Sequence, residues 1–99
     1  MATSSDFKDF VFEQLKSVDG MSCKKMMGEY LLYVKGTLIG GIYDDRLLLK
    51  PTENNGDYGM QEELPYAGAK TFMLAAPVDD AELLTEITLK TFYDLNKSL

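Results

Sequence analysis

The chain has no histidine, no tryptophan and a single cysteine among its 99 residues. Without histidine it lacks the most common general base and the most common metal ligand. The lone Cys23 cannot form a disulfide within the chain, which favours a reducing cytoplasm, and we expect it as a small, partly buried residue. No apolar run approaches the roughly 20 residues of a membrane helix, and residues 1–6 lack the basic and apolar regions of a secretory signal.

Basic residues are also scarce. Ten Lys and Arg stand against 16 Asp and Glu, which gives a net charge of −6. Direct nucleic-acid binding requires a concentrated basic surface, so we expect none, and we expect no membrane association. The remaining composition, 45% hydrophobic and 26% charged, is typical of a globular protein. The length suits a single domain over residues 1–99, and we find no internal repeat and no linker.

Both ends of the sequence predict helices. Near the N-terminus, apolar residues recur at helical spacing, so we predict a helix over about residues 5–18. Ser4 or Ser5 would cap its start, and Gly20 would end it. Near the C-terminus, Asp79 followed by Glu82 predicts a capping pair that opens a second helix, which runs to about residue 96.

The middle of the chain predicts a sheet. Two-residue turns at Lys35–Gly36 and Asp44–Asp45 join three strands in an antiparallel meander. These strands are Glu29–Val34, Thr37–Tyr43 and Arg46–Lys50. A polar loop over Glu53–Gly59 with one short helical turn follows, and then a strand over Thr71–Ala76. The fold class is therefore α+β, with the two terminal helices packed on the meander sheet as a two-layer sandwich.

Tight turns fix the register, and the register decides which side chains share a face. The predicted pairs include Val34 with Thr37, Leu32 with Ile39, Tyr30 with Gly41 and Tyr43 with Arg46. The face expected beneath the helices contains Leu31, Tyr33, Leu38, Gly40, Ile42, Leu47 and Leu49.

The opposite face is apolar where a solvated face would be polar, which predicts an interface. Its candidate residues are Tyr30, Leu32, Val34, Ile39, Tyr43 and Leu48, with Lys24, Lys25 and Arg46 at the rim. The alternative is that a third layer, such as the C-terminal helix, covers this face.

The sequence offers little that would support catalysis. The carboxylate pairs Asp44–Asp45, Glu62–Glu63 and Asp79–Asp80 fall at turns or at a helix start, where such residues serve as turn and cap residues. There is no phosphate-binding loop, no dinucleotide fingerprint, no nucleophile elbow and no acidic calcium loop. We therefore predict that the protein is not an enzyme and has no catalytic residue, cofactor or metal site.

Three segments resemble the TfoX (Sxy) N-terminal domain family, and the likeness extends from about Asp6 to Leu95. They are Lys24–Tyr30 (KKMMGEY), Leu32–Gly36 (LYVKG) and Asp44–Lys50 (DDRLLLK). In that family the first segment typically reads Arg-x-Met-Phe-Gly, and the third reads Leu-Tyr-Leu-Lys after an aspartate–glycine turn. Here Lys24 or Lys25 stands in place of the arginine and Met27 in place of the phenylalanine, and the stretch between Lys50 and Leu64 is shorter.

The resemblance implies a fold similar to the secretion-chaperone-like α+β folds, among which dimers are common, so we expect a homodimer. The family includes the N-terminal half of a bacterial competence regulator, a co-activator that works with the cyclic-AMP receptor protein. The sequence here resembles a free-standing short member without that regulator's C-terminal half. We expect a cytoplasmic interaction domain whose partner is a transcription regulator or RNA polymerase. The alternative is a small-ligand-binding or chaperone-like module, and an enzyme is the third hypothesis.

Overall fold

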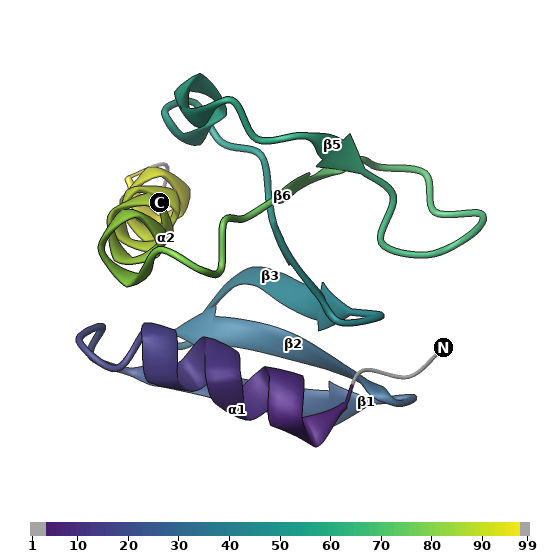
Figure 1. The fold of residues 1–99 in the computed structure, drawn as a ribbon. Coiled ribbons are helices and arrows are strands. Elements are labelled where there is room, and N and C mark those ends of the chain that lie inside the picture. Colours follow the sequence, from purple (N-terminus) through teal and green to yellow (C-terminus); the bar gives the residue numbers. More distant parts are fainter. Residues whose placement is uncertain (1–3, 98–99) are drawn as a thin grey trace.

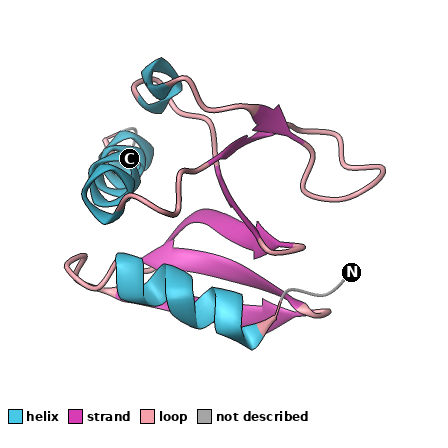
Figure 2. Cartoon of the chain, in the orientation of Figure 1, coloured by secondary structure: helices cyan, strands magenta, loops and turns pink. Residues whose placement is uncertain are grey.

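The computed structural model describes residues 4–97, which fold into two helices and a six-stranded antiparallel sheet (Figures 1 and 2). The α+β class with N- and C-terminal helices is therefore confirmed. The strands lie in the order β1-β2-β3-β4-β6-β5, so the first four form a meander. In chain order the elements are α1 (Ser5–Gln14), β1 (Met21–Met26), β2 (Glu29–Val34), β3 (Thr37–Tyr43), β4 (Arg46–Leu49), the 3₁₀ helix η1 (Asn55–Tyr58), β5 (Glu62–Glu63), β6 (Met73–Ala75) and α2 (Ala81–Asn96).

Side-chain caps begin both helices. The Ser4 hydroxyl accepts a hydrogen bond from the Phe7 amide at 3.1 Å, which confirms the predicted cap, although α1 ends four residues earlier than expected, at Gln14 rather than residue 18. At α2 the cap is Asp80 rather than Asp79, and its carboxylate accepts from the Leu83 amide at 3.1 Å. The helical turn predicted in the loop after β4 is η1. Neither helix in the part of the chain described is long and apolar enough to span a membrane.

Three hairpin turns of the same kind join β1 to β4. Both central residues of each turn have positive φ: Met27–Gly28 (54° and 84°), Lys35–Gly36 (49° and 82°) and Asp44–Asp45 (52° and 56°). These angles are those of turns whose twist matches that of the flanking strands. The second and third turns were predicted. The first turn and β1 were missed, because β1 is an exposed edge strand without alternating apolar residues. Cys23 lies on β1 and is exposed, so the expectation of partial burial was wrong.

A β-bulge changes the predicted register. Tyr33 pairs with Leu38, but the next pair is Leu32 with Gly40, so Ile39 is the extra residue on β3. The pairs predicted across the two turns, Val34 with Thr37 and Tyr43 with Arg46, are confirmed. The pairs predicted between β2 and β3 beyond the bulge are wrong by one residue, because Tyr30 pairs with Ile42 rather than Gly41. One inserted residue moves every following side chain to the other face.

This shift places four of the nine residues predicted for the interface in the core. Tyr30, Leu32, Val34 and Ile39 are at most 7% exposed and pack with side chains of α1 and α2 in one cluster, so the prediction that they form an exposed face was wrong. Their partners in that cluster are Val11, Leu15, Val18, Ile42, Leu47, Leu49, Leu84 and Ile87. Leu48, also predicted at the interface, is fully buried. Leu31, Tyr33 and Leu38, which were expected in the core, are only partly buried.

One polar group in this core lacks a hydrogen-bond partner among the described residues. It is the Thr88 hydroxyl of α2, in a residue that is 0% exposed. Burying a hydroxyl without a partner has a desolvation cost, so replacing it with a methyl group should be favourable. We expect Thr88→Val to raise the free energy of unfolding by about 1 kcal/mol, measured by urea denaturation.

Thr91→Val, one turn along α2, is the matched control. The Thr91 hydroxyl donates to the Ile87 carbonyl at 2.8 Å and accepts from the Asn55 amide at 2.9 Å. Replacing this hydroxyl with a methyl group should therefore lower the free energy of unfolding by about 1–2 kcal/mol. If Thr88→Val destabilised the protein as much as Thr91→Val does, the assignment of an unpaired hydroxyl at Thr88 would be contradicted.

Candidate functional site: an open groove on the outer sheet face

The sheet face opposite the core cluster carries a long open groove. By register, Leu31, Gly41 and Leu48 share this outer face, and Tyr43 and Arg46 lie on it as well. We call the whole hollow the outer groove. It consists of a larger part of about 760 Å³ and a smaller part of about 430 Å³. The two parts adjoin, because Leu31, Tyr43 and Tyr66 line both.

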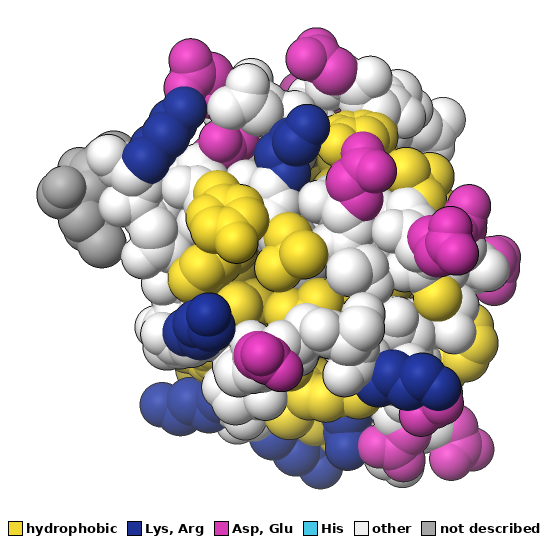
Figure 3. All heavy atoms as spheres, turned by 90° about the vertical axis from the view of Figure 1, so that its left-hand side faces the viewer, with side chains coloured by type: hydrophobic (Ala, Val, Ile, Leu, Met, Phe, Trp, Pro, Cys, Tyr) yellow, Lys and Arg dark blue, Asp and Glu magenta, His cyan; other side chains and the backbone are white. Residues whose placement is uncertain are grey.

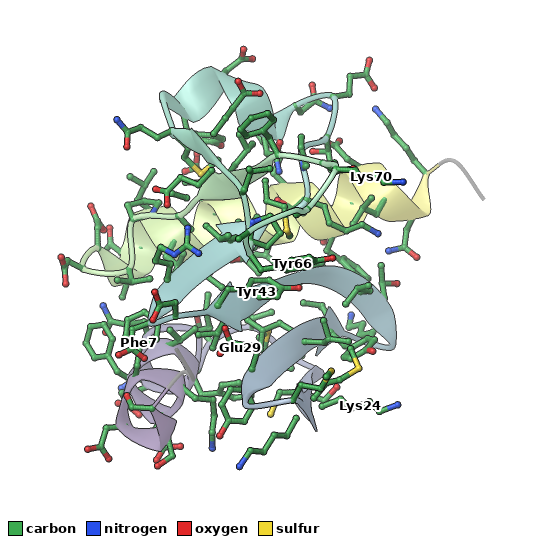
Figure 4. The ribbon with its side chains drawn as sticks, turned by 90° about the vertical axis from the view of Figure 1, so that its right-hand side faces the viewer. Phe7, Lys24, Glu29, Tyr43, Tyr66 and Lys70 are labelled. Atoms are coloured by element: carbon green, nitrogen blue, oxygen red, sulfur yellow. The ribbon has the colours of Figure 1, made fainter. Side chains whose placement is uncertain are left out.

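Two tyrosines lie at the centre of the outer groove. Tyr43 comes from the end of β3, and Tyr66 comes from the segment between β5 and β6. Their ring centroids are 6.4 Å apart with the rings tilted by 51°, and Figure 4 shows them side by side. Burial raises the pKa of the Tyr43 phenol, and the nearby Tyr66 and Glu29 raise it further. Tyr43 therefore stays neutral at physiological pH, while Tyr66, 62% exposed, offers its ring to solvent.

Arg46 holds the segment that carries Tyr66. Its guanidinium donates to the Glu63 carboxylate at 2.7 Å, to the Leu64 carbonyl at 3.2 Å and to the Pro65 carbonyl at 3.1 Å. The sequence predicted Arg46 as a charge at the rim of an interface. The structure instead uses most of its donors within the chain, so Arg46 positions one wall of the groove.

Two lysines line the outer groove, and a third lies on the same face of the sheet. Lys50 and Lys70 line the larger part, together with Leu38, Met73 and Leu95. Lys24 is exposed on β1 and pairs in register with Leu31, which places it on the outer face. In Figure 4, Lys70 lies on one side of the two tyrosines and Lys24 on the other. Lys25 pairs with the buried Tyr30, so its side chain leaves the sheet on the helix side.

The smaller part of the groove ends at the first hairpin. Met26 is 48% exposed and Met27 is 96% exposed, and both line it together with Glu29. The Glu29 carboxylate accepts a hydrogen bond from the Asp44 amide at 3.0 Å, which ties this end of the groove to the β3–β4 turn. Methionine side chains are flexible and polarisable, so this end can adapt to the shape of an apolar occupant.

Of the residues predicted for the interface, Tyr43 lines the outer groove and Tyr30, although buried, lines its smaller part. Lys24 lies on the outer face beside the groove, and Leu32, Val34 and Ile39 lie in the core. The sequence analysis did not single out Tyr66, Lys70, Met73 or Leu95 as site residues. Tyr66 and Lys70 lie in an irregular segment whose course no periodic pattern could indicate. Among residues 4–97 there is no group of three or more His, Cys, Asp or Glu side chains placed to hold a metal ion.

Comparisons with known proteins agree with the sequence resemblance. The family model for the TfoX N-terminal domain matches residues 13–92. The chain is also 36% identical over 80 residues to an uncharacterized 12.7 kDa protein in the trpE 5′ region of Spirochaeta aurantia, an alignment that covers 79% of this chain and 70% of that protein. No solved structure matches the chain significantly, so the likeness to secretion-chaperone folds stays a prediction.

Proposed function

Because the chain belongs to the TfoX N-terminal domain family, we propose that it is a non-enzymatic interaction domain of the cytoplasm. In this proposal it acts on transcription by binding a regulator or RNA polymerase, and the outer groove is the contact surface. The observation that carries the proposal is the groove itself, an open apolar surface with the exposed Tyr66 ring at its centre. Tyrosine is enriched at protein interfaces because it offers a large rigid area with a polar tip.

The groups that line the groove favour binding over catalysis. The raised pKa of Tyr43 makes its phenol a poorer general base at neutral pH. The chain has no histidine that could activate a hydroxyl or thiol nucleophile. What the groove does offer is apolar area, three tyrosine rings and the amines of Lys50 and Lys70.

We expect Tyr66→Glu to abolish partner binding without loss of fold, since this side chain is 62% exposed. The measurement is affinity capture from native lysate followed by mass spectrometry of the bound proteins. Wild-type protein should enrich a transcription regulator or polymerase subunits, and Tyr66→Glu should lower their recovery at least about tenfold. Circular dichroism and the melting temperature should be unchanged.

Tyr93→Glu provides the matched control. Tyr93 is 65% exposed on α2, and it lies two residues from Leu95, on the opposite side of that helix from the groove. It should capture the same proteins as the wild type. Equal recovery by all three proteins, or recovery of no transcription protein by the wild type, would contradict the proposal.

A second candidate function is small-ligand binding. The larger part of the groove has a volume of about 760 Å³, and small-molecule sites have volumes of this order. A ligand that binds only the folded state raises the melting temperature. A compound from a small-molecule panel that stabilises the wild type but not Tyr66→Glu would support this function. The homodimer remains a prediction, with sedimentation equilibrium as its measurement.

A further inference from the structure

We propose that the outer groove binds an extended acidic segment of the partner protein, with large apolar side chains between its carboxylates. This inference rests on the proposed function and names the chemistry of the partner. The carboxylates would meet Lys24, Lys50 and Lys70, and the apolar side chains would contact Tyr43, Tyr66 and the aliphatic floor of the groove.

The distribution of ion pairs carries the charge argument. Lys8, Lys16 and Lys97 each form an ion pair with a carboxylate, at 2.7, 3.2 and 3.0 Å. By contrast, Lys24, Lys50 and Lys70 form no ion pair with any residue in 4–97. The larger part of the groove is lined by Lys50 and Lys70 and by no described Asp or Glu, whereas Glu29 lines the smaller part. In a chain of net charge −6, the larger part therefore selects an occupant that is both apolar and anionic.

Three other lysines, Lys25, Lys35 and Lys90, also form no ion pair with a described residue, but none of them lines the groove. Lys25 leaves the sheet on the helix side. Lys35 and Lys90 lie over the rings of Phe92 and Tyr58, at 5.8 and 5.4 Å from the ring centroids. Figure 3 shows the side of the molecule that was on the left in Figure 1, where apolar side chains also gather. There, however, both acidic and basic side chains surround them, so that surface indicates no preference for the charge of a partner.

The shape of the groove favours an extended chain. Its larger part is lined by Lys50 and Lys70, its smaller part is lined by Met26 and Met27, and the two adjoin at Tyr43 and Tyr66. Alternate side chains of an extended segment point to opposite sides, so apolar residues can enter the groove while the acidic ones between them reach the lysines.

The same charges argue against two other occupants. A second copy that met this face with its own would bring its Lys24, Lys50 and Lys70 towards the same lysines, and like charges repel. A nucleic acid would make favourable contacts with the lysines and tyrosines, but the net negative charge of the whole chain would repel it. An acidic peptide carries fewer charges than a phosphate backbone and brings the apolar groups that the groove accepts.

The test is fluorescence anisotropy with labelled peptides and the full chain. The probe alternates acidic residues with leucine and phenylalanine. One control peptide replaces its acidic residues with lysine, and the other replaces its apolar residues with serine. We expect only the first peptide to bind, with an affinity that falls as salt is added because the ion pairs are exposed.

Two variants with the same change of charge sharpen the test. Lys70→Glu, in an exposed groove residue, should weaken binding of the acidic–apolar peptide about tenfold. Lys16→Glu, on the segment after α1 and paired with Glu13, should leave the affinity unchanged within about twofold. Melting temperatures would show that both variants are folded.

Several results would overturn the inference: the acidic–apolar peptide does not bind, Lys70→Glu binds it as tightly as the wild type does, or an oligothymidine binds more tightly than the peptide. A dimer that dissociates in Tyr66→Glu, while no peptide binds, would also overturn it. The proposed function would survive if a captured regulator still required Tyr66 but was neither displaced by the peptide nor affected by Lys70→Glu. If the peptide bound but no regulator were captured in a way that required Tyr66, the result would contradict only the proposed function.

Discussion

Replacing Gly40 with alanine is expected to lower the free energy of unfolding by about 3–5 kcal/mol. A Cβ at this position would collide with the Leu48 carbonyl oxygen and would lie 2.9 Å from the Leu49 Cα. Both groups belong to the backbone of β4, so no side-chain rotation relieves the contact. Relief requires β3 and β4 to separate beside the bulge, where Gly40 pairs with both Leu32 and Leu49.

Two other glycines separate crowding from backbone strain. Gly56, in η1, has open space where a Cβ would lie, and Gly56→Ala should change the stability by less than about 0.5 kcal/mol. Gly36 also has open space but a φ of +82°, so Gly36→Ala should cost about 1 kcal/mol through strain alone. Urea denaturation of the three variants gives the comparison. A Gly40→Ala variant no less stable than Gly36→Ala would show that β3 and β4 adjust at little cost.

The close approach at Gly40 explains what the sequence could and could not predict about the sheet. The turns at Lys35–Gly36 and Asp44–Asp45 were predictable, because turn chemistry is local and depends on which residues tolerate positive φ. The bulge was not, because the consecutive glycines Gly40–Gly41 have no side chains whose pattern would reveal a change of face. Because β2 carries apolar residues on both of its faces, its sequence pattern was equally consistent with either register.

The candidate site, like the sheet, could be predicted from the sequence only in part. The apolar residues of the sheet led to the prediction of an exposed apolar face, and the outer groove is the apolar surface that the structure leaves open. Which face is free depended on the bulge, so the predicted residues Leu32, Val34 and Ile39 proved to be core residues. Tyr66 and Lys70 reach the groove through long-range bonds such as those of Arg46 to the carbonyls of Leu64 and Pro65, and no local pattern encodes such contacts.

Asn55→Ala is expected to lower the free energy of unfolding by about 3 kcal/mol, again measured by urea denaturation. Asn55 is 0% exposed, and its amide donates to the Lys50 carbonyl and to the Thr91 hydroxyl, each at 2.9 Å, while its carbonyl oxygen accepts from the Thr52 amide at 2.8 Å. Truncation removes all three bonds and leaves their partners without a replacement. Removing one partner from a buried bond costs more than the bond itself contributes, because the remaining group stays desolvated.

Asn54→Ala is the matched control, because Asn54 is exposed and its side chain makes a single bond, to Asp94 at 2.7 Å. It should cost about 1 kcal/mol or less. The effects of Asn55→Ala and Thr91→Val should be less than additive, because both variants break the bond between these two residues. Strict additivity, or an Asn55→Ala effect as small as that of Asn54→Ala, would contradict the role assigned to this network.

The Asn55 network also links the stability of the fold to the outer groove. Through the bond to its carbonyl, Asn55 fixes the backbone of Lys50, whose side chain lines the groove, and the bond to Thr91 fixes the same loop to α2. Hydrogen exchange in Asn55→Ala should therefore increase first over residues 50–58 while the β1–β3 hairpins stay protected. The affinity for the acidic–apolar peptide should fall, but by less than in Lys70→Glu, because the Lys50 backbone loses the bond from Asn55 while the Lys50 amine keeps its charge. An unchanged affinity would mean that Lys50 contributes to binding only through its charge, wherever the loop places it.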